Sequence, residues 1–183
     1  MVNFINRNST KRNLILSIVA SIIIIAIMSV ATQTFVYGVY GDFTMPDTRL
    51  GYTFNDIQTA FDSIGAEGLY VWAIAHSPDF LFPLAYSFSM MFGIILELRK
   101  VDRDAGNLRL MIFLPLAGGI ADYLENILIL SQIATYPNLS ELVITISSIV
   151  TLAKWAFLAL GFVVIFGLLI FGIVQTISSK KTD

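Results

Sequence analysis

A long apolar stretch that contains carboxylates constrains this chain more than any other part of its sequence. The stretch runs from Leu108 to Gln132, which is long enough to cross a bilayer as a helix. It nevertheless contains Asp122, Glu125 and Asn126, which are spaced i, i+3 and i+4, so a helix carries them on one face. A carboxylate inside a membrane span costs roughly 2.5–3.5 kcal/mol on the insertion scale. Other parts of the chain must therefore supply partners for these side chains.

The composition places the chain among membrane proteins. Of its 183 residues, 56% are hydrophobic and 13% are charged, with a mean hydropathy of +0.78, whereas a soluble domain carries about 25% charged residues. The chain has no cysteine, which excludes disulfides, thiolate metal sites and cysteine nucleophiles. Its one histidine excludes a metal site built on two or three histidines of one chain. We therefore expect a single all-α integral membrane domain over residues 1–183.

The first transmembrane helix is expected over about residues 14–37. An uninterrupted apolar run from Leu14 to Ala31 follows a basic segment that contains Arg7, Lys11 and Arg12. A secretory signal peptide has the same order of basic and apolar residues, but its apolar region covers only about 7–15 residues. The longer run here favours a helix that is retained in the membrane.

The loop that follows, about residues 39–68, is acidic and is expected to contain a short amphipathic helix. Thr53 is a suitable N-cap for this helix, and Gly65 suits its C-terminal end. The apolar residues between them lie at helical spacing on one face: Ile57, Ala60, Phe61 and Ile64. We expect this helix to lie over the external mouth of the transmembrane bundle. The alternative is an ordinary ordered loop that shields the ends of the helices.

Three further spans complete the predicted four-helix bundle. They are expected over about residues 70–98, 108–134 and 141–178. The first of them has a start or a kink at Pro78, and Pro83 is expected to bend it or to leave backbone carbonyls without partners. A straight helix over the last is ~55 Å long, well beyond a ~30 Å hydrocarbon core. That helix is therefore expected either to tilt and protrude or to break near Ser147-Ser148.

Basic residues indicate which side of the membrane is cytoplasmic. Among the Lys and Arg residues outside the spans, only Arg49 falls on one side of a four-span protein. The other side holds Arg7, Lys11, Arg12, Arg99, Lys100, Arg103, Arg109, Lys180 and Lys181. The positive-inside rule then predicts a multi-pass protein of the cell membrane with both termini in the cytoplasm.

Six polar residues are expected to gather near the external mouth of the bundle. When depth is counted at ~1.5 Å per residue from the cytoplasmic ends of the helices, all six fall in the outer half of the membrane: His76, Asp79, Asp122, Glu125, Asn126 and Lys154. Lys154 is the expected counter-charge for Asp122 or Glu125. A buried ion pair roughly breaks even against an apolar pair, but removal of one partner costs about 3–5 kcal/mol. We therefore interpret the cluster as mainly structural, and as a place where a small ligand, a lipid headgroup or a protein partner could bind.

Simpler roles are open for some of the polar residues. Asp79 follows Ser77-Pro78 and suits the N-terminal cap of a helix. His76 can be a solvated histidine at the membrane interface, and Asn126 can form a hydrogen bond to a neighbouring helix. Tyr86 and Met90 are assigned to packing.

With these residues in view, the chain resembles a family of small four-helix membrane proteins over about residues 45–170. An Asp-x-x-Glu-Asn element in the third helix and a Lys-Trp element at the start of the fourth are typical of this family. The motifs are Gly51-Tyr52, Ile64-Gly65-x-x-Gly68, Asp79-Phe80-x-Phe82-Pro83-x-x-Tyr86, Asp122-Tyr123-x-Glu125-Asn126 and Lys154-Trp155. The chain departs from the family pattern at Leu69, where an arginine would follow Gly68. The resemblance implies a four-helix transmembrane bundle and implies no activity.

Two alternative functions would use the same cluster. A membrane-embedded hydrolase could bind one divalent ion, with Mn, Mg or Ca favoured over Zn, through His76, Asp79, Asp122 and Glu125. A row of acids could instead carry protons or cations across the membrane. The sequence has no nucleotide-binding loop, nucleophile elbow or cofactor motif, and topology explains its basic residues. We therefore favour a non-enzymatic protein with no cofactor and no nucleic-acid partner, in contact with the lipid bilayer and open to a protein partner or a second copy of itself.

Overall fold

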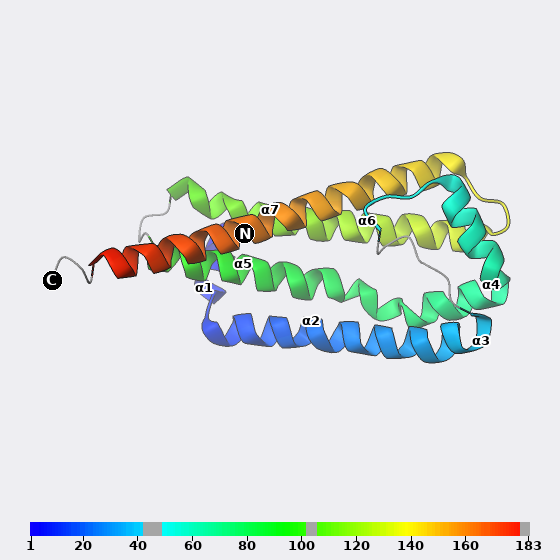
Figure 1. The fold of residues 1–183 in the computed structure, drawn as a ribbon, viewed down its shortest axis with the longest axis horizontal. Coiled ribbons are helices and arrows are strands. Elements are labelled where there is room, and N and C mark those ends of the chain that lie inside the picture. The colour runs from blue at the N-terminus through cyan, green and yellow to red at the C-terminus, as the bar shows by residue number, and fades with distance from the viewer. Residues whose placement is uncertain (42–48, 102–105, 180–183) are drawn as a thin grey trace.

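The computed structural model describes residues 1–41, 49–101 and 106–179, and all regular structure in these ranges is helical (Figure 1). The α-helices are α1 (Val2–Asn8), α2 (Lys11–Thr32), α3 (Gly38–Tyr40), α4 (Phe54–Ala75), α5 (Phe82–Val101), α6 (Phe113–Thr135) and α7 (Glu141–Ser179). A π-helical turn over Gln33–Tyr37 joins α2 to α3, and 3₁₀ turns over Ser77–Phe80 and Gly106–Ile112 precede α5 and α6. The all-α class expected from the sequence is confirmed.

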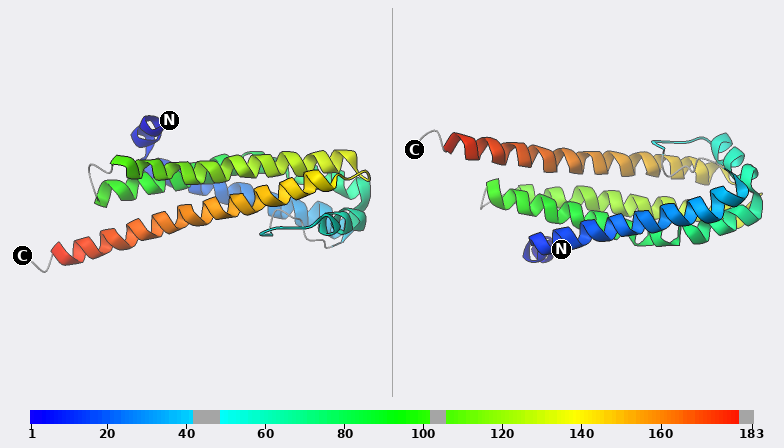
Figure 2. Two further views of the ribbon diagram at one scale, coloured as in Figure 1. Left: turned by 90° about the horizontal axis from the view of Figure 1, so that it is seen from above. Right: turned by 60° about the horizontal axis from the view of Figure 1, so that its bottom comes forward.

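Helices α2, α5, α6 and α7 run lengthwise and form the body of the molecule (Figures 1 and 2). α5 is the central helix, because it packs against α2, α6 and α7, and α7 also packs along α6. Three helical stretches are long and apolar enough to cross a membrane: Lys11–Tyr40, Asn107–Thr135 and Glu141–Gln175. The structure therefore indicates a multi-pass membrane protein. α5 is not among these stretches, and it packs against three neighbouring helices.

Helix α4 lies across one end of the lengthwise helices (Figure 1). Its start is the expected one, because the Asp56 amide donates to the Thr53 hydroxyl and the Thr53 amide donates to the Asp56 carboxylate. These two hydrogen bonds form a complete capping box. The expected apolar face is buried: Ile57, Ala60, Phe61 and Ile64. The amphipathic helix over the end of the bundle is therefore confirmed.

The sequence predicts that the amphipathic helix ends at Gly65, and this prediction is wrong because α4 continues to Ala75. Gly65 has φ 68° and ψ 179°, a conformation that glycine adopts readily, and the helix resumes beyond it as far as Ala75. This second part buries Leu69 and Trp72 against the bundle. Residues 66–75 thus belong to the cap over the bundle, and the second lengthwise helix begins only at Phe82.

The prolines and serines distort the helices less than expected. Pro78 lies in the 3₁₀ turn between α4 and α5, where no long helix has to continue. Pro83 is the second residue of α5, where a backbone N–H would have no partner within the helix in any case. α7 continues through Ser147-Ser148 without a break. Its 39 residues make it ~58 Å long, and it extends beyond its neighbours at its C-terminal end (Figure 2).

The apolar core has two parts along the bundle. One part lies beneath α4 and includes Phe61 and Ile129. The other includes Ile112 and also Ile5 from the short helix α1, an element that the sequence did not indicate. Along the chain, the acidic residues of α6 fall between Ile112 and Ile129. The polar residues of α6 therefore lie at a level between the two apolar parts.

Candidate functional site

A buried ion cluster joins α6 to α7. The Lys154 ammonium nitrogen lies 2.5 Å from Glu125 Oε2 and 3.4 Å from Asp122 Oδ1. Lys154 is 5% exposed, Glu125 0% and Asp122 6%. The pairing of Lys154 with an acid of the third span is therefore confirmed, and both carboxylates take part in it.

Hydroxyl groups from two other segments complete the surroundings of Glu125. Thr151, one turn before Lys154, donates from Oγ1 to Glu125 Oε1 at 2.5 Å. Tyr52, which precedes α4, donates to Ser147 Oγ at 2.7 Å, and its oxygen lies 3.2 Å from Thr151 Oγ1. Burial raises the pKa of Tyr52 to about 12, so its hydroxyl remains a neutral donor. Glu125 thus has an ion-pair partner at one oxygen and a hydrogen-bond donor at the other.

Asp122 also uses both of its carboxylate oxygens. Oδ1 faces Lys154, and Oδ2 accepts a hydrogen bond of 2.9 Å from the Tyr86 hydroxyl on α5. This contact requires α5 and α6 to approach closely. Gly119 permits the approach, because a Cβ there would overlap Ser87 Oγ of α5. The cluster therefore joins three lengthwise helices and not only two.

A second polar contact joins the turn before α5 to α6. Asn126 Nδ2 donates to Asp79 Oδ2 at 2.8 Å, and the Tyr123 hydroxyl donates to the Phe80 backbone oxygen at 2.5 Å. Asp79 is 9% exposed and lies in the first turn of the 3₁₀ segment. The role of Asn126 as a hydrogen-bonding residue between helices is confirmed. Asp79, for which a capping role was left open, accepts this hydrogen bond from α6 in the first turn of the 3₁₀ segment.

His76 lies at the C-terminal end of α4 and faces α2. Its Nδ1 is 3.4 Å from Thr32 Oγ1, and its ring stacks on Trp72 with the centroids 4.2 Å apart. Within residues 1–41, 49–101 and 106–179, no group of three or more His, Asp and Glu side chains is arranged to hold a metal ion. The set considered for a divalent ion is thus not assembled: His76, Asp79, Asp122 and Glu125.

Several residues of the site were not identified from the sequence. Tyr86 was assigned to packing, and no role was given to Tyr52, Ser147 or Thr151. A signal exists on α7, since Ser147, Thr151 and Lys154 follow at i, i+4 and i+7 on one helix face. Tyr52 and Tyr86 each lie in a motif of the family resemblance, and their presence in these motifs could have identified them as site residues.

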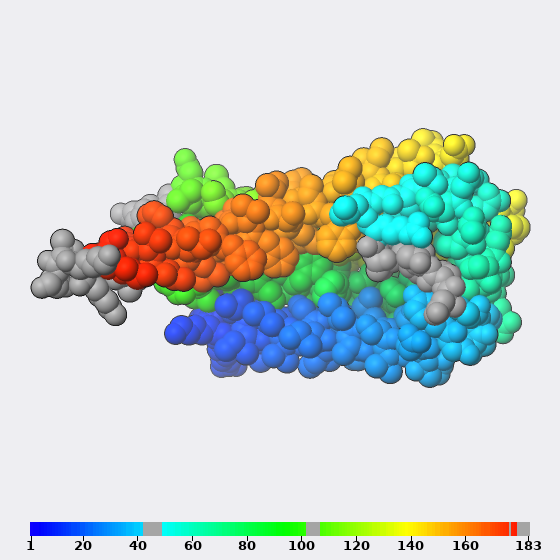
Figure 3. Space-filling view, viewed as in Figure 1, coloured from blue at the N-terminus to red at the C-terminus, as the bar shows by residue number. Residues whose placement is uncertain are grey.

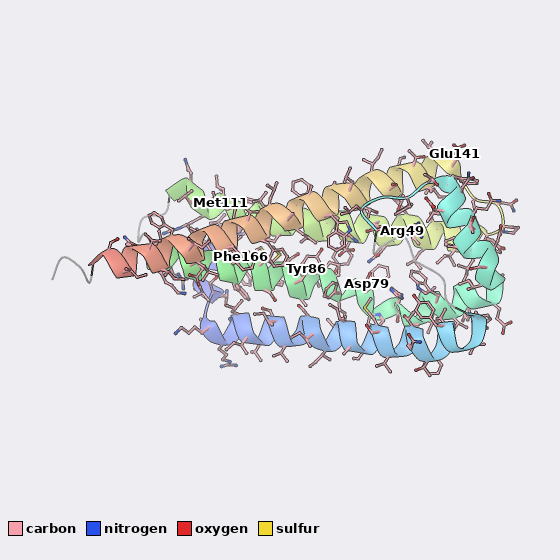
Figure 4. The ribbon with its side chains drawn as sticks, in the orientation of Figure 1. Arg49, Asp79, Tyr86, Met111, Glu141 and Phe166 are labelled. Carbon is pink, nitrogen blue, oxygen red and sulfur yellow. The ribbon has the colours of Figure 1, made fainter. Side chains whose placement is uncertain are left out.

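A long groove opens beside the cluster. It has a volume of about 1000 Å³ and lies between α2 and α7, with α5 at its floor. Figure 3 shows the α5 atoms (green) set back between α2 (blue) and α7 (orange). One end of the groove has a polar lining that includes Asp79, Tyr86, Asp122 and Lys154. Figure 4 shows Asp79 nearer the end that α4 covers and Tyr86 farther along the bundle; the rest of the lining is mainly apolar.

Comparisons of the chain with protein-family models, with curated proteins and with solved structures find no match.

Proposed function

We propose that the protein is a non-enzymatic four-span protein of the cell membrane with both termini in the cytoplasm. α5 is the fourth span, in addition to the three long apolar stretches, because its 20 residues make it ~30 Å long, which is the thickness of a hydrocarbon core. The orientation is supported by Arg99 near the end of α5, which donates to the backbone oxygens of Asn6 and Ser9. The basic N-terminal segment and the basic end of α5 therefore lie together. Arg49 lies beside α4 at the opposite end, where it pairs with Asp56.

The buried cluster is assigned a structural role. The observation that carries this assignment is Glu125, which has no exposed surface and has Lys154 and Thr151 on its two oxygens. A carboxylate that acts as a general base must reach a proton on a substrate or a water molecule. Glu125 has no exposed surface, so it does not meet this requirement. Its partners lie on α7, and Thr151 links them to Tyr52 in the segment before α4. The cluster thus holds the helices and the cap in one register.

The family resemblance is also part of the proposal. Five of its residues, from four separate motifs, meet in one cluster: Tyr52, Tyr86, Asp122, Glu125 and Lys154. We include in the proposal that the chain is a member of the family of four-helix membrane proteins that it resembles.

The topology can be tested with single cysteines, because the chain has none of its own. Asn3 in α1 and Asn138 in the turn between α6 and α7 are both exposed positions. Asn138→Cys should react with a membrane-impermeant maleimide in intact cells, and Asn3→Cys only after permeabilisation. Labelling of both positions from outside, or the opposite pattern, would contradict the proposed four-span orientation.

A further inference from the structure

The groove between α2 and α7 has the dimensions of a lipid chain. Its lining extends along α2 from Leu14 to Gln33, or ~28 Å of helix. Its volume of about 1000 Å³ is ample for extended alkyl chains, which are only ~4–5 Å thick. The groove therefore suits the acyl chains of a lipid.

The groove also has the polarity of a lipid. One end presents the carboxylate, phenol and ammonium groups of the cluster, and the walls beyond it are mainly aliphatic and aromatic, as at Ile22 of α2 and Phe162 of α7. Glu97 of α5 also lines the groove, and it is paired with Lys100. The opening faces sideways between α2 and α7 (Figure 3). A lipid could therefore enter from the bilayer without crossing water, with its headgroup at the polar end.

An unsatisfied donor lies next to the polar end. Trp72 is 5% exposed, and its indole N–H has no hydrogen-bond partner in the described part of the chain. Trp72 lines a small cavity of about 20 Å³ together with His76 and Asp79, and these two residues also line the groove. A buried donor without an acceptor destabilises the fold, because the donor has lost its hydrogen bonds to water. An oxygen atom of a bound headgroup would remove this destabilisation.

The formal charges at the polar end select the headgroup. Among the described residues that line the polar end, Asp79 and Asp122 carry two formal negative charges against the one positive charge of Lys154, so a cationic group on the ligand is complementary. We infer that the groove binds a membrane lipid whose headgroup carries an ammonium group, such as phosphatidylethanolamine. Its ammonium group lies toward Asp79 and Asp122, and its acyl chains lie along α5. This inference rests on the membrane placement proposed above.

Native mass spectrometry of the purified protein in detergent tests the headgroup. Phosphatidylethanolamine and phosphatidylglycerol with the same acyl chains are added separately, so only the headgroup differs. The ethanolamine lipid should remain bound and should bind about tenfold more tightly than the glycerol lipid, because one close charge pair is worth at least this much. Asp79→Asn should remove most of that preference, since an amide oxygen still accepts the hydrogen bond from Asn126.

Matched substitutions test the position of the acyl chains. Gly93 lies on the groove floor and a Cβ there meets only ordinary contacts, whereas Gly167 of α7 faces open space outside the groove. Gly93→Leu should lower lipid retention about tenfold by filling the space of several methylene groups, and Gly167→Leu should leave it unchanged. Ile25→Trp, in the groove wall, and Ile27→Trp, outside it, form a second pair on α2 if Gly93→Leu does not fold.

Three results would overturn the inference. They are equal binding of the two lipids, lipid retention that is unaffected by both groove substitutions, and a dimer in which a second copy fills the groove in place of a lipid. If the cysteine labelling shows the expected topology, any of these results overturns the lipid inference alone and not the four-span proposal. Failure of the cysteine labelling pattern would instead refute the four-span proposal itself.

Discussion

Replacement of Lys154 by methionine should strongly destabilise the protein. Methionine keeps an unbranched apolar side chain of similar length and removes only the ammonium group. Glu125, which is 0% exposed, and Asp122, which is 6% exposed, would then lose their shared cation at 2.5 and 3.4 Å. Removal of one partner from a buried ion pair costs about 3–5 kcal/mol. Against a total stability of about 5–15 kcal/mol, this loss is a large fraction.

The measurement is equilibrium unfolding in detergent, followed by circular dichroism, with Lys100→Met as the matched control. Lys100 also forms a 2.5 Å ion pair, with Glu97, but its side chain is 57% exposed. The Glu97 side chain is 13% exposed, so this pair is partly solvated, and Lys100→Met should lower the unfolding free energy by less than Lys154→Met does. The same chemical change at two sites thus isolates the effect of burial.

Removal of the two carboxylates should rescue the Lys154→Met variant. With Asp122→Asn and Glu125→Gln added, no uncompensated charge remains, and the amides can still bond to the hydroxyls of Tyr86 and Thr151. The triple variant should regain most of the lost 3–5 kcal/mol. A Lys154→Met protein within about 1 kcal/mol of the wild type, or a triple variant no more stable than the single one, would refute the structural role of the cluster.

Two further predictions concern the glycines and the cap of α4. Gly119→Ala should destabilise the protein by about 1–3 kcal/mol, because its Cβ would overlap Ser87 Oγ, whereas Gly167→Ala should be neutral or stabilising in the same unfolding assay. Hydrogen bonds from Thr53, followed by the charge of Arg49, hold the pKa of Asp56 below its usual value near 3.8. The contribution of this carboxylate is therefore present above pH 3.8 and is lost as the pH falls through the lowered pKa, so the protection factors of the amides in the first turn of α4 should fall only below pH 3.8. Unchanged protection factors there would show that the capping box does not depend on ionised Asp56.

The parts of the structure that follow from short-range chemistry could be predicted from the sequence. The capping box at Thr53 needs only residues three positions apart, and the buried face of α4 follows from helical spacing. The pairing of Lys154 with acids of α6 follows from the cost of a lone charge in an apolar span.

The parts that depend on packing could not be predicted in this way. Gly65 was expected to end the amphipathic helix, but a glycine with positive φ allows either a stop or a turn into a new helical segment, and the contacts of Leu69 and Trp72 favour the second. Tyr86 bonds to Asp122 because α5 and α6 approach closely at Gly119. A groove between α2 and α7 has no signature in the sequence at all, since its lining alternates between three helices.

The ion cluster and the groove follow from the same placement of α7. Near the cluster α7 lies very close to its neighbours, since a Cβ at Gly118 would be 2.9 Å from Leu158 and one at Gly161 would be 2.6 Å from Met90. Toward its C-terminal end α7 diverges from the other helices (Figure 2). An entirely apolar contact could slide or rotate, because aliphatic contacts have no preferred partner, whereas Lys154 can meet both carboxylates at only one level. The charges therefore determine where α7 is attached, and the groove runs along α7 from Lys154 to Leu169, starting at this attachment.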